Sequence, residues 1–202
     1  GLNLLWHRYG YNYGQDIQWG DINSPVQINC TFQRNKPLIP QAFPKIISCI
    51  GIDLNPINLT NPDEVLWLRA LIWPEHKERV NLLDSAIELA RKNTPTIITG
   101  DAVEKLPEIL SSVPEYVTLC IFHTFTLNQF SSESSEKLFS ILTQHSFKQD
   151  LFIVSIEMKG KAKPLVEITF FEKGIKTSHI IAHCSPYGDW IEWLFYHTNQ
   201  DL

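Results

Sequence analysis

Apolar residues gather along this chain in short, nearly continuous runs that are separated by polar and turn-forming residues. Runs of this length without alternation are typical of strands that are buried on both faces of a parallel sheet. The clearest run extends from Ile46 to Ile52 and stops at Asp53. We predict four such strands, at residues 46–52, 94–101, 116–125 and 150–159.

A helical spacing of apolar residues fills the intervals between these runs. It predicts amphipathic helices at residues 60–73, 74–93, 102–113 and 131–146, and a fifth at Leu2–Tyr9. Thr60 or Asn61 can cap the first of the four, and Pro62 suits its first turn. Trp73-Pro74 interrupts the pattern, so a new helix is expected to start there.

Three further segments lack both patterns. Residues 17–32 have two β-prone runs around a Gly-Asp turn, which predicts a hairpin, and three prolines between 37 and 44 predict an extended connection. Residues 165–185 alternate around Gly174, which predicts an antiparallel hairpin. Residues 186–194 are expected to form a short helix or a turn.

Three strand–helix units followed by a hairpin predict an α/β fold with a largely parallel sheet and an antiparallel edge. The length of 202 residues suits a single domain that covers the whole chain, with residues 17–44 as a hairpin and loop insertion.

The amino-acid composition argues against nucleic acids and membranes as partners. The formal net charge is −5 and there is no long run of Lys or Arg, which argues against nucleic-acid binding. No apolar run approaches the ~18 residues that a membrane helix needs, and no signal peptide is visible. The four cysteines form no C-x-x-C motif, so we expect reduced thiols and a cytoplasmic location.

Candidate site residues follow three of the predicted strands. In an open parallel sheet ligands bind beyond the carboxyl ends of the strands, where Asp53, Asp101 and His123 would lie. A carboxylate at one strand end can accept hydrogen bonds from both hydroxyls of a ribose, and one at the next strand end can accept from the adenine amino group. This arrangement suits a cofactor that contains adenosine.

Structural alternatives exist for each of these residues. Asp53 could belong to a turn that bonds its own backbone, Asp101 could cap the helix that follows, and His123 could be a satisfied structural residue. His179 and His183 are ~13 Å apart on a strand, too far to share one metal ion. Trp67 and Trp73 are expected to pack against the rest of the protein. No nucleophile elbow, P-loop, H-E-x-x-H or complete G-x-G-x-x-G motif is present.

Five segments together carry a resemblance that runs from Gly1 to about Leu194. They are GLNLLWHRYGYNYG, GIDLNPINLTNPDEVLWLRALIWPEH, TGDAVEKLP, IFHTF and SPYGDWIEWL. They resemble a bacterial family that is catalogued as a domain of unknown function. Its members look like S-adenosylmethionine-dependent methyltransferases in their C-terminal portion, which implies a Rossmann-like, methyltransferase-type fold with helices on both faces of the sheet.

The resemblance also implies roles for particular residues. Gly1 and Asn3 would match the end of the first cofactor loop, Asp53 would face the ribose, and Asp101 with Ala102 would face the adenine. His123 would stand where the methyl acceptor sits and serve as the base. No Asn/Asp-Pro-Pro-Tyr-type motif follows the strand that carries His123.

The resemblance further implies that the chain is the C-terminal part of a longer protein and starts inside the first cofactor loop. The first strand of the sheet would then be missing from the chain. Its absence would leave two rows of backbone groups unpaired, so we expect an N-terminal segment or another chain to complete the sheet.

Three functions remain open on the sequence alone. The leading hypothesis is an S-adenosylmethionine-binding methyltransferase that acts on a small molecule. The second is a non-catalytic Rossmann-like interaction or regulatory module, with eleven Phe and six Trp available for a partner surface. The third is an NAD-dependent oxidoreductase, because Asp53 would suit its ribose equally well.

Overall fold

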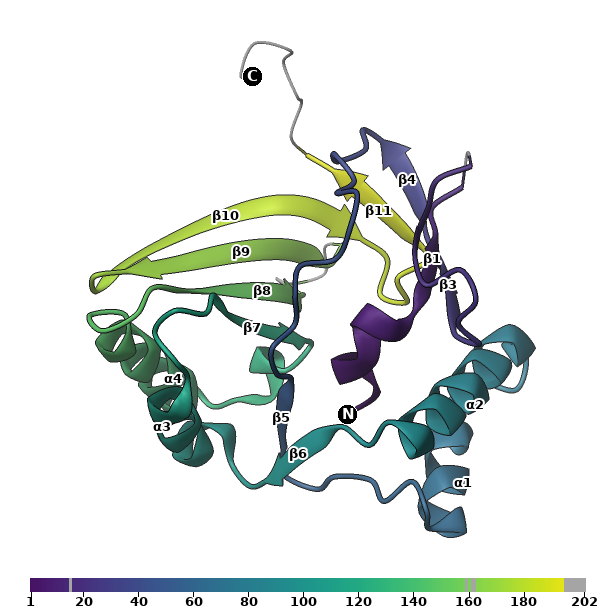
Figure 1. The fold of residues 1–202 in the computed structure, drawn as a ribbon, viewed down its shortest axis with the longest axis horizontal. Helices are drawn as coiled ribbons and strands as arrows, with labels where there is room; N and C mark the ends of the chain where they lie inside the picture. The colour runs from purple at the N-terminus through teal and green to yellow at the C-terminus, as the bar shows by residue number, and fades with distance from the viewer. Residues whose placement is uncertain (15, 159, 161–162, 195–202) are drawn as a thin grey trace. The chain divides into compact units, whose positions relative to one another are not determined.

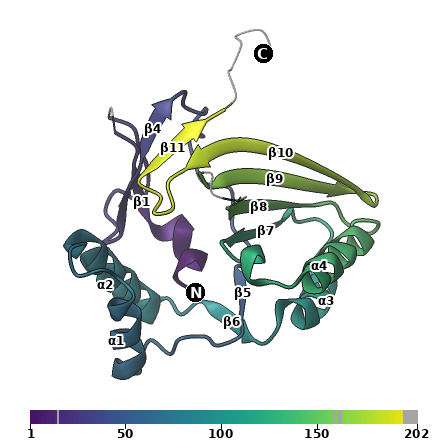
Figure 2. The ribbon, with the colours of Figure 1, turned by 180° about the vertical axis from the view of Figure 1, so that it is seen from behind.

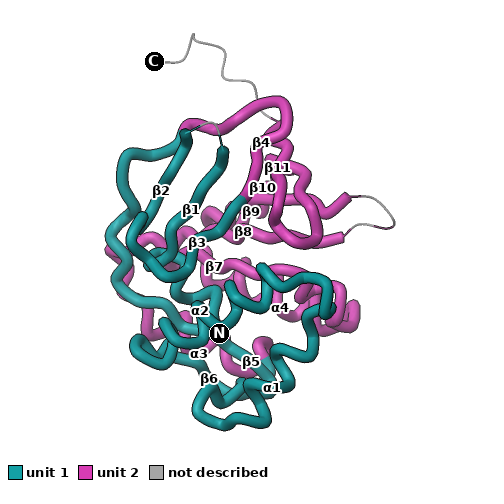
Figure 3. The backbone as a smooth tube through the Cα atoms, turned by 90° about the vertical axis from the view of Figure 1, so that its right-hand side faces the viewer, with its two compact units in different colours: residues 1–29, 39–101 teal, residues 30–38, 102–202 magenta. Residues whose placement is uncertain are grey.

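A computed structural model describes residues 1–14, 16–158, 160 and 163–194 of the chain. It shows a mixed α/β protein with helices and several sheets. The chain forms two compact units, which Figure 3 distinguishes by colour: unit 1 contains residues 1–29 and 39–101, and unit 2 contains residues 30–38 and 102–202. The organisation as a single domain stays a prediction, and each unit is described by itself.

Unit 1 combines short strands with a 3₁₀-helix and two α-helices. Its elements are η1 (Leu2–Arg8), β1 (Gly10–Asn12), β2 (Gln18–Gly20), β3 (Gln27–Asn29), β5 (Ile50–Asp53), α1 (Pro62–Ala70), α2 (Lys77–Lys92) and β6 (Thr96–Thr99).

The first sheet of unit 1 has the strand order β2-β1-β3. The hairpin predicted at residues 17–32 is wrong, because β2 and β3 do not pair with each other. Instead β2 is antiparallel to β1, and β3 is parallel to β1 on its other side. The chain reverses between β1 and β2 at Gly14, whose φ of +75° suits glycine, and Ile17 donates its N–H to the Gly14 carbonyl at 2.9 Å. The tight turn therefore lies before residue 17.

The core of unit 1 joins η1 to α2. Leu5 and Tyr9 are buried with Val26, Ala86 and Ala90. The predicted helix at Leu2–Tyr9 exists as a seven-residue 3₁₀-helix, and the Tyr9 hydroxyl donates to the Leu2 carbonyl at 2.6 Å. The apolar face predicted for α2 is confirmed at Ile87 and Ala90.

The pair β5–β6 is parallel, as predicted, but it forms a two-stranded sheet of its own. The run at residues 46–52 was expected to be a strand buried on both faces, and this is wrong. The strand starts only at Ile50, and the side chains of Ile47 and Ile50 are 59% and 40% exposed. Burial on both faces requires a sheet that other elements cover on both sides, and among the described residues β5 belongs to a sheet of only two strands.

Helix α1 begins as the sequence predicts. The Asn61 side chain accepts a hydrogen bond from the Asp63 N–H, and Pro62 occupies the first turn. However, no residue of α1 is buried. The expectation that Trp67 and Trp73 pack against the protein is wrong, since their side chains are 62% and 67% exposed.

Unit 2 is built on one larger sheet (Figure 1 and Figure 2). Its elements are β4 (Thr31–Arg34), α3 (Ala102–Ser112), β7 (Leu119–Thr124), η2 (Leu127–Gln129), α4 (Ser132–His145), β8 (Leu151–Glu157), β9 (Leu165–Glu172), β10 (Ile175–Cys184) and β11 (Trp190–Trp193).

The sheet of unit 2 is mixed rather than largely parallel. Its order is β4-β11-β10-β9-β8-β7. The pairs β7–β8 and β11–β4 are parallel, whereas the pairs from β8 to β11 are antiparallel. The hairpin of β9 and β10 around Gly174 is confirmed, and the φ of Gly174 is +80°.

The helix or turn expected at residues 186–194 is present as a turn at residues 186–189, whereas the strand β11 that follows it was not expected. A turn at Gly188, with a φ of +75°, sends the chain back so that residues 191–193 pair with β10. Trp190 and Trp193 are large aromatic residues that favour strands, and the pairing with β10 and β4 prevails over the short helical pattern.

Both α-helices of unit 2 cover the same face of its sheet (Figures 1 and 2). Both helices bury leucines, such as Leu110 and Leu142, and Phe139 of α4 stacks on Phe171 of β9, whose register partner on β8 is the buried Leu151. Among the described residues of this unit no α-helix covers the other face, so the expectation of helices on both faces is not met there. The side chains of Phe122 and Phe170, which alternate with the buried positions, are 40% and 48% exposed.

Candidate functional site

Two predicted site residues lie at the same edge of the β5–β6 pair. Asp53 is the last residue of β5 and is paired in register with Thr99, the last residue of β6. Asp101 follows two residues later, and the intervening Gly100 donates its N–H to the Asp53 carbonyl at 2.9 Å. Because both strands run in the same direction, their carboxyl ends bring the two aspartates to one edge of the pair.

The Asp53 side chain is exposed and already makes one local hydrogen bond. Its Oδ1 accepts a hydrogen bond from the Asn55 N–H at 2.9 Å. This bond forms the local turn that was considered for Asp53 as the alternative to a ligand role. That bond occupies one carboxylate oxygen and leaves Oδ2 for another donor. Asp101 is half-buried. The turn and a ligand role are thus compatible at Asp53.

The start of η1 lies beside these strands. A Cβ added at Gly51 of β5 would lie 2.9 Å from Leu4 Cδ1, and one added at Gly1 would lie 3.0 Å from Ile97 Cδ1. Leu4 therefore lies against β5 and Gly1 against β6, and Asn3 is exposed on the same short helix.

Ala102, the remaining predicted cofactor residue, is the first residue of α3. It follows Asp101 directly in the chain, so the peptide bond keeps it next to that aspartate.

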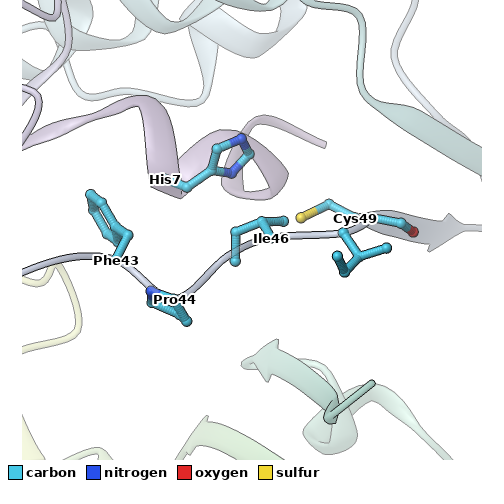
Figure 4. A pocket seen from close by; sticks show the side chains of 7 residues that line it. His7, Phe43, Pro44, Ile46 and Cys49 are labelled. Carbon is cyan, nitrogen blue, oxygen red and sulfur yellow. The ribbon is translucent and has the colours of Figure 1, made fainter. Parts of the chain in front are cut away.

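Two cavities of unit 1 lie at the other end of the same strands. One has a volume of about 400 Å³ and the other of about 270 Å³, and both are lined by His7 and Cys49. Figure 4 shows His7 on η1 facing the extended segment that carries Phe43, Pro44, Ile46 and Cys49. Cys49 precedes β5 and Thr96 begins β6, so these cavities belong to the amino ends of the strands.

Burial disfavours the charged forms of Cys49 and His7, which line both cavities. Burial raises the pKa of the Cys49 thiol, which disfavours the nucleophilic thiolate. Burial, together with the nearby positive charge of Arg8, lowers the pKa of His7 and favours its neutral form. Asp53 and Asp101 are not among the residues that line either cavity.

In unit 2, His123 lies near the carboxyl end of β7, and its side chain contacts that of Glu157. His123 Nδ1 is 2.9 Å from Glu157 Oε1, and each side chain is 12% exposed. The same Oε1 accepts from the N–H groups of Thr126 and Leu127 at 2.9 and 3.0 Å. Glu157 Oε1 is therefore within hydrogen-bonding distance of three groups: the His123 ring and the two backbone N–H groups of the loop that follows β7.

Glu157 was not predicted from the sequence. It ends the run LFIVSIE, where Leu151 and Ile153 are buried and where a glutamate on the same face is unusual. This unusual position of a glutamate was the signal in the sequence that could have pointed to Glu157. The partner could not be deduced, because the register of β7 on β8, which sets His123 opposite Ser155, is a tertiary property.

Among the described residues, no group of three His, Cys, Asp or Glu side chains is placed to hold a metal ion. In the same part of the chain, no helix combines the length and the apolar character that crossing a bilayer requires.

The fold and these sites define a mixed α/β protein with polar side chains at the carboxyl ends of two parallel strand pairs. The chain belongs to the bacterial family described as "Uncharacterized protein conserved in bacteria (DUF2332)", whose model matches residues 1–193. No curated protein and no solved structure matches the chain.

Proposed function

We propose that the protein binds S-adenosylmethionine through unit 1 and transfers its methyl group to a small molecule. The observation that carries the proposal is the position of Asp53 and Asp101 at one edge of neighbouring parallel strands, beside the start of η1. A methyltransferase-type fold is part of the proposal, and the parallel pairs β5–β6 and β7–β8, with helices following their strands, support it.

The proposed contacts follow from the chemistry of a nucleoside. Asp53 accepts hydrogen bonds from the ribose hydroxyls, and Asp101, next to Ala102, accepts from the adenine amino group. Gly1 and Asn3 border the remainder of the cofactor. Methyl transfer requires mainly that the acceptor is aligned with the sulfonium, and a general base for the acceptor's proton is optional.

Isothermal titration calorimetry on Asp53 variants tests the proposal. The purified protein is titrated with S-adenosylmethionine and with its demethylated product. D53N preserves an oxygen for the Asn55 N–H but removes the charge, whereas D53A removes both. Because a hydrogen bond to a charged group contributes about 1.5–3 kcal/mol, we expect D53N and D53A each to weaken binding at least about tenfold.

Controls separate a ligand role from a structural one. E75Q alters an exposed carboxylate of unit 1 and should bind like the wild type. If D53A alone weakened binding and D53N did not, the turn rather than a ribose contact would explain the effect. The absence of binding to the wild-type protein at millimolar concentration would refute the proposal. NAD, titrated in the same way, tests the oxidoreductase alternative.

A second candidate, a non-catalytic interaction module, is supported by the exposed apolar surface of α1 and the residues after it. The side chains of Leu66, Trp67, Leu71 and Trp73 are each more than 60% exposed. Clustered exposed apolar groups of this size commonly mark sites of protein interaction. A cellular phenotype that survives D53A/D101A but is lost in W67S/W73S would favour this candidate over the methyltransferase.

A further inference from the structure

The pair formed by His123 and Glu157 in unit 2 carries chemistry that an isolated histidine would lack. We propose that Glu157 is a positioning residue that fixes the tautomer of His123, so that Nε2 of His123 is the proton acceptor for a ligand with an O–H or N–H group. This inference goes beyond the function proposed for unit 1 and does not rest on it.

The sheet register places the two side chains on the same face. His123 is paired with Ser155, and Glu157 lies two residues further along β8, so the Glu157 side chain points to the same side as that of Ser155. This is the face whose other positions include the buried Leu151 and Ile153. The pair is thereby held at the carboxyl end of two parallel strands, where α/β sheets place their ligands.

Glu157 is held rigidly before any ligand arrives. Its Oε1 accepts three hydrogen bonds, from His123 and from the N–H groups of Thr126 and Leu127. The N–H groups come from the loop that follows β7, where Phe125 has a φ of +52° and donates its N–H to the Ile156 carbonyl at 2.8 Å. Two strands and their loop therefore fix the position of the carboxylate.

The position of Oε1 determines which ring nitrogen carries hydrogen. A carboxylate only accepts hydrogen bonds, so His123 Nδ1 donates to it across 2.9 Å. In a neutral imidazole the other nitrogen, Nε2, then has the free lone pair. With 12% of each side chain exposed, the hydrogen bond lies in surroundings of low dielectric constant, which strengthen it.

The resulting proton transfer is balanced. The proton of the ligand's O–H or N–H group moves to Nε2, and the electron pair of the broken bond remains on the ligand's oxygen or nitrogen. The imidazolium retains its Nδ1–H bond to Glu157, whose negative charge stabilises it. Loss of the proton from Nε2 to water restores the starting state.

Nitrogen NMR of the full chain, labelled with ¹⁵N at histidine, tests the proposal without any methyl donor. The signal of His123 is assigned with H123Q, and spectra are recorded at a pH at which imidazole is neutral. In the wild type we expect hydrogen mainly on Nδ1. In E157Q the acceptor is neutral, and because charge-assisted hydrogen bonds are roughly twice as strong as neutral ones, we expect the ratio of the Nδ1–H to the Nε2–H form to fall about fivefold.

The control E172Q alters an exposed glutamate at the end of β9 and should leave the ratio unchanged. E157D, which keeps the charge on a shorter side chain, should retain more of the Nδ1–H form than E157Q does. Circular dichroism establishes that each variant is folded. A wild-type His123 with hydrogen on Nε2, or a ratio that is the same in folded E157Q, would overturn the proposal. Failure of the calorimetry with an intact tautomer effect would refute the methyl donor and leave the positioning role standing.

Discussion

At the scale of single residues, the candidate chemistry divides into a part that is local in sequence and a part that is not. Asp53 and Asp101 could be predicted because one ends its strand and the other follows its strand closely, and parallel neighbours align their carboxyl ends. Glu157 could not, because it is 34 residues from His123 and meets it only through the register of β7 on β8. Local rules locate strand ends but do not determine which ends meet.

Tyr9 provides a prediction about stability and pH. Burial raises the pKa of its phenol from 10.0 to about 12, because the charged form is disfavoured in the core. Between these values the unfolded chain has lost the proton and the folded chain still holds it. The contribution of Tyr9 to stability is therefore complete below pH 10 and is lost as the pH rises through about 12.

We expect the free energy of unfolding of Y9F to fall less steeply than that of the wild type over this pH range, as measured by urea denaturation. At neutral pH, Y9F should be less stable by about 1 kcal/mol, because the hydrogen bond to the Leu2 carbonyl is lost. Y116F, which alters an exposed phenol, serves as the control. Parallel pH curves for Y9F and the wild type would contradict the prediction.

At the scale of elements, helix ends followed from the sequence better than strand pairings did. The predicted cap at Asn61 is present, and the Asn61 amide also donates to Glu64 Oε1 at 2.9 Å. Capping depends on residues within one turn, so local sequence suffices. The strand β11 was missed because residues 190–193 acquire their conformation from β10 and β4.

The cap of α1 can be tested by substitution. N61A removes the acceptor for the Asp63 N–H and should destabilise the helix by about 1 kcal/mol. Because no residue of α1 is buried, we expect the effect to be local, with amide hydrogen exchange in α1 accelerated about fivefold. N61S retains a capping oxygen without placing a negative charge beside Glu64, so it should exchange more slowly than N61A. Unchanged exchange in N61A would indicate that the cap does not stabilise α1.

At the scale of the whole molecule, the chain forms two units that each have apolar cores. Leu5, Tyr9, Val26, Ala86 and Ala90 form one core cluster in unit 1. Unit 2 buries Leu142 and Phe171, and a further cluster contains Val166, Ala182 and Cys184. The sequence predicted one largely parallel sheet because predicted strands and helices alternate from residue 46 to residue 159. This alternation does not show which strands pair, so the division into separate sheets could not be predicted.

The division into two units predicts how the protein responds when a substitution creates a cavity in the core of one unit. L142A removes a side chain that is 0% exposed and should destabilise unit 2 by about 2–5 kcal/mol. We expect hydrogen exchange measured by mass spectrometry to accelerate in β7, β8, β9 and α4, while β1, β3 and α2 change less. A uniform acceleration throughout the chain would show instead that the units unfold as one. L38A, at a side chain that is 75% exposed, is the control.

The sequence by itself determined the mixed α/β character, most helices, the hairpin around Gly174 and the aspartates at strand ends, because these depend on periodicity, caps and turns that act over a few residues. Only the tertiary structure decided that β2 and β3 flank β1, that β5 and β6 form a separate pair, that β11 is a strand, and that Glu157 meets His123. Each of these depends on contacts between distant segments, whose free energy is set by the packing of the folded chain.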